Sequence, residues 1–94
     1  MRHPLSNAKA KTLIVEILAT GTLSFSPHAY DEMANDKLDE LDVRNTLRGG
    51  FCRFCELRNG SYRYRFETYQ QGVVVAFRSQ KAAVVVTAFR LKKR

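Results

Sequence analysis

The sequence predicts an α+β domain in which three helices pack on a mostly antiparallel four-stranded sheet. In residues 61–67, aromatic side chains alternate with charged ones, which is the period of a half-buried strand. Two continuous apolar runs rich in β-branched residues, 73–77 and 83–89, are typical of central strands. The first half of the chain instead has apolar residues at helical spacing. Helices are therefore expected to precede the sheet.

Each expected helix begins at a residue that can cap it. Ser, Asn and Asp side chains accept hydrogen bonds from the free amides of a first helical turn, and glycine favours the C-terminal end. Proline suits the first helical position, because its missing amide hydrogen would be unpaired there. The predicted helices cover about 6–20, 27–35 and 39–48, with Ser6 or Asn7, Ser26 and Asp39 as caps, Gly21 and Gly49-Gly50 as stops, and a short strand at 23–25.

The sheet is expected to be a meander of consecutive antiparallel strands. Residues 51–57 form its first strand, and Asn59-Gly60, a strong hairpin signal, joins this strand to 61–69. Gln71-Gly72 and residues 79–81 mark the later turns. Apolar residues at core spacing are Leu13, Ile14, Ile17, Ala29, Met33, Leu38, Leu41, Val43, Leu47, Tyr62 and Tyr64, whereas Lys9 and Lys11 are assigned to a solvated helix face.

The 94 residues are expected to form a single domain, 1–94, because this length supplies one small core. Its parts are an N-terminal helix (6–20), a short strand with two helices (23–49), the sheet (51–91) and a basic tail (92–94). No apolar stretch approaches the roughly twenty residues of a membrane span, and no signal-peptide pattern follows Met1. We therefore expect a cytoplasmic protein.

Positive charge is concentrated in the second half of the chain. The formal net charge is +7; from Arg44 onward there are twelve basic and two acidic residues, whereas residues 1–43 hold four basic and seven acidic ones. Such an asymmetry is typical of proteins that bind nucleic acid, although an ordinary basic surface or a protected strand edge would give it too. RNA is the partner that we favour.

Cys52 and Cys55 have the C-x-x-C spacing once, within a predicted strand. On a regular strand, residues three apart point to opposite faces. A zinc site would also need two more ligands, from His3, His28 or a second subunit. We therefore expect no metal and no other cofactor.

A helix start and several later positions carry a family resemblance: Ser26-Pro27-His28-Ala29, Met33, Leu38, Asp42-Val43, Leu47, Gly49, and a closing Val85-Val86-Thr87-Ala88-Phe89. From about Ser6 to Lys93, the chain resembles a family of small bacterial proteins catalogued as a domain of unknown function. That family resembles the BrnT and RelE toxins, and the first helix makes the chain similar to MqsR-type toxins too. The resemblance implies the RelE-like fold, with helices on one face of a curled antiparallel sheet. It also implies a metal-independent endoribonuclease that acts on messenger RNA, the toxin of a toxin–antitoxin system, held inactive by a cognate antitoxin.

Metal-free RNA cleavage requires a base for the 2′-hydroxyl, an acid for the leaving oxygen, and cations beside the phosphorus. The residues predicted to serve are His28 as base or acid, Glu32 one turn later, and the arginines Arg63, Arg65 and Arg90. Arg63 and Arg65 rank first, because the two-residue strand period puts them on one face. Side chains predicted to bind nucleic acid are Arg44, Arg48, Arg63, Arg65, Arg78, Lys92 and Lys93. For Arg44 and Arg48, a solvated helix face is an equal alternative.

Two alternatives remain open. Many relatives of this kind have Arg-Met where this chain has Glu32-Met33, which favours a module that binds nucleic acid or a ribosomal surface without cleaving RNA. An interaction protein is the other alternative, in which an exposed sheet edge pairs with an acidic partner such as a disordered antitoxin segment. A homodimer through 51–57 is a further possibility.

Overall fold

All three expected helices form, each from its expected cap. The computed structural model describes residues 4–91; His3 and the basic tail, with Lys92 and Lys93, lie outside them. Ser6 Oγ accepts from the Lys9 amide at 3.1 Å, and Ser26 Oγ accepts from the Ala29 amide at 3.0 Å. The elements are α1 (Asn7–Thr20), β1 (Thr22–Phe25), α2 (Pro27–Asp36), α3 (Glu40–Gly49), β2 (Phe51–Arg58), β3 (Ser61–Glu67), β4 (Gln71–Ser79) and β5 (Ala82–Arg90).

The predicted four-stranded, mostly antiparallel sheet is wrong in its number of strands. The structure has a five-stranded mixed sheet in the order β1-β5-β4-β3-β2, in which β1 runs parallel to β5. The register pairs Thr22 with Ala82 and Phe25 with Val85. A parallel neighbour must be reached by a crossover connection, and here most of the chain lies between the two partners. The α+β class and the meander of β2 to β5 agree with the expectation.

Two of the predicted turns contain a glycine, Gly60 and Gly72, and the structure confirms only the first of them. Asn59 and Gly60 have φ of 51° and 77°, as a tight hairpin of the primed type requires, so this predicted turn is confirmed. Gly72 is not a turn residue but lies inside β4. A Cβ there would stand 2.5 Å from Cζ of Phe89, so the ring that covers the strand would have to shift to admit any other residue.

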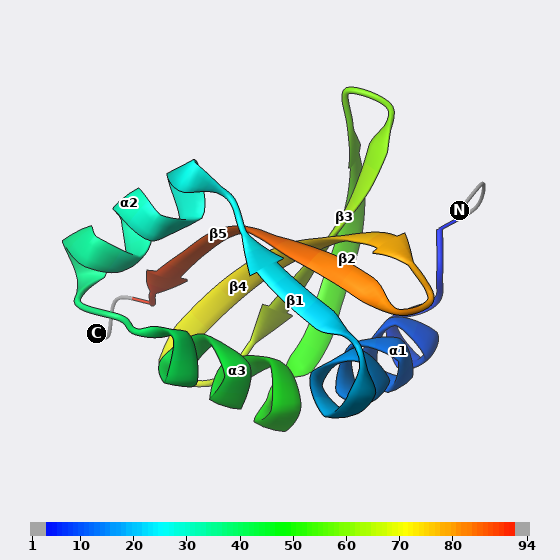
Figure 1. The fold of residues 1–94 in the computed structure, drawn as a ribbon, viewed down its shortest axis with the longest axis horizontal. Helices are drawn as coiled ribbons and strands as arrows, with labels where there is room; N and C mark the ends of the chain where they lie inside the picture. The colour runs from blue at the N-terminus through cyan, green and yellow to red at the C-terminus, as the bar shows by residue number, and fades with distance from the viewer. Residues whose placement is uncertain (1–3, 92–94) are drawn as a thin grey trace.

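The core lies between one face of the sheet and the helices α1 and α3, which lie below the sheet in Figure 1, and the buried Ala29 and Met33 of α2 join the same cluster. Tyr64 and Phe66 of β3 are among its largest buried side chains. Leu41, which was expected in the core, is 62% exposed. It lies two residues from buried Val43, about 200° around the helix, and therefore points away from the sheet.

Helix α2 lies along the part of β5 that β1 leaves uncovered. The Ser26 amide donates to the Val85 carbonyl at 3.0 Å, and the Arg90 amide donates to Asp36 Oδ2 at 2.7 Å. In Figure 1, α2 and the tip of the β2–β3 hairpin stand above the sheet on opposite sides. We call the sheet face opposite α1 and α3 the outer face. None of the helices within residues 4–91 has the length and apolar character of a membrane span.

Candidate nucleic-acid interface

Strand β3 alternates between the core and the outer face. Tyr64 and Phe66 are buried, so Arg63, Arg65 and Glu67 between and beside them point to the outer face. The structure thus brings Arg63 and Arg65 together on one surface. In the register, Arg65 stands between Phe54 of β2 and Val74 of β4.

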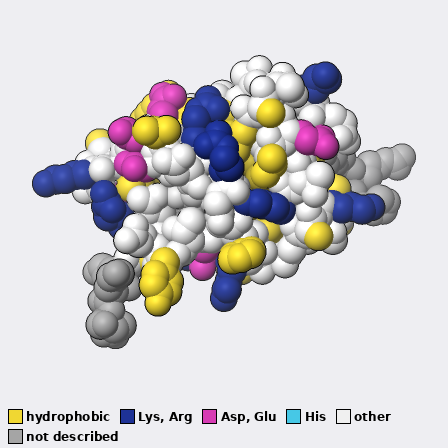
Figure 2. Space-filling model, turned by 90° about the horizontal axis from the view of Figure 1, so that it is seen from below, with side chains coloured by type: hydrophobic (Ala, Val, Ile, Leu, Met, Phe, Trp, Pro, Cys, Tyr) yellow, Lys and Arg dark blue, Asp and Glu magenta, His cyan; other side chains and the backbone are white. Residues whose placement is uncertain are grey.

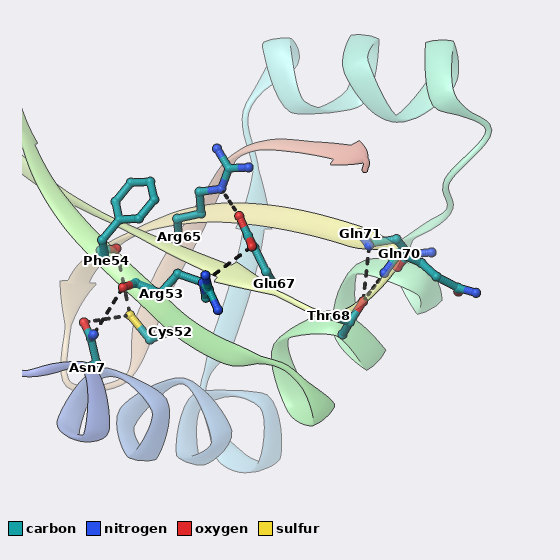
Figure 3. A network of polar contacts seen from close by, with 9 residues as sticks. All are labelled: Asn7, Cys52, Arg53, Phe54, Arg65, Glu67, Thr68, Gln70 and Gln71. Carbon is teal, nitrogen blue, oxygen red and sulfur yellow. Dashed lines mark hydrogen bonds and ion pairs between the residues drawn. The ribbon is translucent and has the colours of Figure 1, made fainter. Parts of the chain in front are cut away.

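Arg65 is held by aromatic rings and a carboxylate. Its guanidinium carbon lies 4.7 Å from the centroid of the Phe89 ring and 5.6 Å from that of Phe54. Its Nε donates to Glu67 Oε2 at 2.5 Å, and Glu67 Oε1 lies 3.7 Å from Nε of Arg53 (Figure 3). One carboxylate therefore orients two guanidiniums, and in both cases through Nε.

Arg63 has no such partner. Its side chain is half-buried, and its Nε is a buried donor with no hydrogen bond among the described residues. Glu56, which faces it across the ladder, lies 3.6 Å from Arg58 Nε. No carboxylate among the described residues pairs with Arg63, so its positive charge is available to an anion through the part of the guanidinium that is not buried. Arg78 is exposed near the end of β4 and lines a separate small pocket.

Arg90, another predicted catalytic residue, is engaged at the C-terminal end of α2. Its Nε donates to the Asp36 carbonyl at 2.8 Å and its Nη2 to the Lys37 carbonyl at 3.3 Å. Carbonyls at a helix C-terminus attract cations, because they lack intrahelical partners and carry the negative end of the dipole. In this structure, Arg90 therefore connects β5 to α2.

His28 and Glu32 lie on the flank of α2 that is turned away from α3. Tyr30 marks the opposite flank: its ring stacks on Phe25 with centroids 5.3 Å apart, and its hydroxyl donates to Glu40 of α3 at 3.1 Å. Both His28 and Glu32 are two residues from Tyr30, about 200° around the helix. The side chain of His28 is exposed and makes no hydrogen bond within residues 4–91.

Arg44 and Arg48 lie on α3, on the other side of the sheet from Arg63. Figure 2 shows that side: Lys and Arg side chains cross the middle of the face, and several Asp and Glu side chains lie at its left end, with others at the right and at the lower edge. Arg48 Nη1 donates to Asn45 Oδ1 at 3.4 Å within the same helix. These two arginines therefore do not join the outer-face cluster. The predicted contacts of Lys92 and Lys93 lie outside the described residues.

Lys11 has a role that the sequence pattern did not indicate. Instead of being solvated, its Nζ donates to three carbonyls where α3 ends: Leu47 at 2.9 Å, Arg48 at 2.6 Å and Gly50 at 2.6 Å. Burial lowers the pKa of Lys11, because partial desolvation disfavours the ammonium form. The hydrogen bonds to the carbonyls offset that cost.

Cys52 and Cys55 both face the core, contrary to the expectation for a regular strand. They stand opposite Phe66 and Tyr64, and the register shifts between Cys52 and Phe54. The β-bulge inserts one residue, so positions three apart come to the same face. Burial raises the pKa of Cys52 to about 11, and its thiol lies 3.5 Å from Asn7 Oδ1 (Figure 3). No three potential His, Cys, Asp or Glu metal ligands gather among the described residues.

The fold and the arginine cluster on the sheet define a small α+β domain whose outer sheet face is aromatic and cationic. The family model described as "Domain of unknown function (DUF4258)" matches residues 25–90, and the chain belongs to this family. The matched part runs from the end of β1 to Arg90, so it includes His28 and every described arginine named above, whereas α1 lies outside it. No curated protein and no solved structure matches the chain. The match to the family model brings no link to BrnT, RelE or MqsR.

Proposed function

We propose that this protein binds RNA on the outer face of its sheet. The observation that carries the proposal is the Arg63 side chain, half-buried with an unpartnered Nε, one strand period from Arg65. Nε itself is closed to solvent, so a phosphate would meet the rest of the guanidinium, whose planar group can contact two phosphate oxygens at once. Phe54, 45% exposed beside Arg65, offers a ring on which a base can stack.

Arg63→Ala is expected to weaken binding of a fluorescent single-stranded RNA dodecamer about tenfold, because one desolvated phosphate contact is lost. The slope of log Kd against log salt should fall by about 1, as expected when one cation leaves the interface. Fluorescence anisotropy at several salt concentrations measures both quantities.

The matched control is Arg48→Ala, because Arg48 lies on the other side of the sheet and has only a weak contact, to Asn45. This variant should bind RNA as the wild type does. The proposal fails if the wild type does not bind RNA at low salt, or if Arg48→Ala weakens binding as much as Arg63→Ala does.

A second candidate function is metal-independent RNA cleavage by a toxin related to BrnT, RelE and MqsR. It is favoured by the position of His28 and Glu32 on the flank of α2 turned away from α3. The proposal requires that this flank and Arg63 reach the same phosphate. His28 would take the proton of the 2′-hydroxyl as that oxygen attacks phosphorus, and a protonated acid would supply the proton for the leaving 5′-oxygen. Arg63 would stabilise the charge on the phosphorane. A cognate antitoxin encoded beside the gene would hold such a toxin inactive.

His28→Ala is expected to reduce RNA cleavage in EDTA about a hundredfold while leaving RNA affinity unchanged, because general acid–base catalysis contributes at least that much. Gel analysis of end-labelled RNA, with detection of the 2′,3′-cyclic phosphate product, measures the cleavage. Intact RNA with the wild type, or equal cleavage by His28→Ala, would leave binding alone as the function.

A further inference from the structure

A pocket of about 490 Å³ lies at the end of the sheet, where α3 ends and β2 begins. Its walls include Phe51, Arg53, Glu67, Tyr69 and Leu91. The volume falls within the roughly 300–1,000 Å³ that is usual for sites of small organic ligands. Glu67, which orients Arg65, also lines this pocket, so the pocket adjoins the outer face.

Two of the pocket's walls are aromatic and open to solvent. Phe51 is 73% exposed and Tyr69 is 89% exposed, the highest values among the exposed large hydrophobic residues described. They come from different elements, Phe51 from the start of β2 and Tyr69 from the loop between β3 and β4. Exposed rings beside a cationic groove are what proteins use to stack unpaired bases.

Arg53 brings positive charge to the same pocket. Its side chain is 63% exposed, and Glu67 Oε1 lies 3.7 Å from its Nε. Glu67 also binds Arg65 through Nε (Figure 3). The Nη groups of both arginines have no hydrogen-bond partner within residues 4–91. Glu67 therefore acts as a positioning residue. Two guanidiniums against one carboxylate leave a net positive charge, which suits one phosphate diester.

We propose that this pocket binds one unpaired nucleotide of an RNA strand, with its base against Phe51 and Tyr69 and its phosphate on Arg53. The inference deepens the proposed RNA binding and rests on it. It adds a preference for single strands, since the bases of a duplex are stacked inside the helix and cannot enter a side pocket. The strand would continue from the pocket past Arg65 to Arg63.

The test uses single-stranded RNA dodecamers that each carry 2-aminopurine at a different position, because the fluorescence of this base is quenched when it stacks. With the wild type, we expect quenching to be strong at one or a few positions. Phe51→Ala and Phe51→Leu should weaken affinity about tenfold and abolish that quenching, since each removes the ring. Phe51→Leu keeps an apolar side chain, so it separates the loss of stacking from any loss of folding.

Leu57→Ala is the matched control. Leu57 is 58% exposed on the same strand, at the far end near the hairpin turn, and its removal should change neither affinity nor quenching. If the wild type binds no RNA, the proposed function fails and this site fails with it. If RNA binds but no position is quenched, or if both Phe51 variants behave as the wild type does, the pocket site alone is overturned. Equal affinity for duplex RNA would also overturn it.

Discussion

Gly50→Ala is expected to lower the free energy of unfolding by about 3 kcal/mol, at the upper end of the range for overpacked sites. Gly50 is buried between α3 and β3. A Cβ at this position would stand 2.5 Å from the Glu67 carbonyl oxygen and 2.7 Å from that of Thr46. Both atoms belong to the backbone of packed elements, so no flexible side chain can move aside. Urea denaturation followed by circular dichroism measures the change.

The neighbouring glycine gives a matched control with the opposite sign. Gly49 is exposed at the last position of α3, and nothing lies within 4 Å of a Cβ built on it. Gly49→Ala should therefore raise the free energy of unfolding by about 0.5 kcal/mol, because alanine favours the helix and restricts the unfolded chain. Equal effects of the two substitutions would contradict this assignment of the glycine pair.

Local signals explain why so much of the fold could be predicted from the sequence. A cap such as Ser26 acts on an amide three residues away, and the Asn59-Gly60 turn needs only its own positive φ angles. The parallel pairing of β1 with β5 has no such signal, because Thr22 and its partner Ala82 are separated by most of the chain. The strand itself was expected, but its place in the sheet was not.

The site shows the same division between local and tertiary information. The common face of Arg63 and Arg65 follows from the two-residue period of one strand. The partners of these side chains do not, since Arg65 meets Phe89 from a strand two places away in the sheet, and Arg90 turns to a helix end. Arg53 was missed because it lies at a β-bulge, where the alternation that would place it on a face is interrupted.

Lys11→Met is expected to lower the free energy of unfolding by roughly 2–3 kcal/mol, because hydrogen bonds from a charged donor contribute more than neutral ones. Methionine keeps the length and packing of the side chain but has no donor. The carbonyls of Leu47, Arg48 and Gly50, which Lys11 now satisfies, would lose a common partner at the end of α3. The favourable interaction of a cation with the helix dipole would be lost as well.

Lys9→Met tests whether position or charge is responsible. Lys9 lies two residues earlier on the same helix and is exposed, and its side chain makes no hydrogen bond within the described part of the chain. Its substitution should change the free energy of unfolding by less than about 0.5 kcal/mol, as is usual at surface positions. If Lys9→Met and Lys11→Met destabilise the protein equally, the contact between α1 and the end of α3 contributes nothing specific. A larger loss for Lys11→Met would identify this lysine as the residue that connects α1 to the C-terminal end of α3.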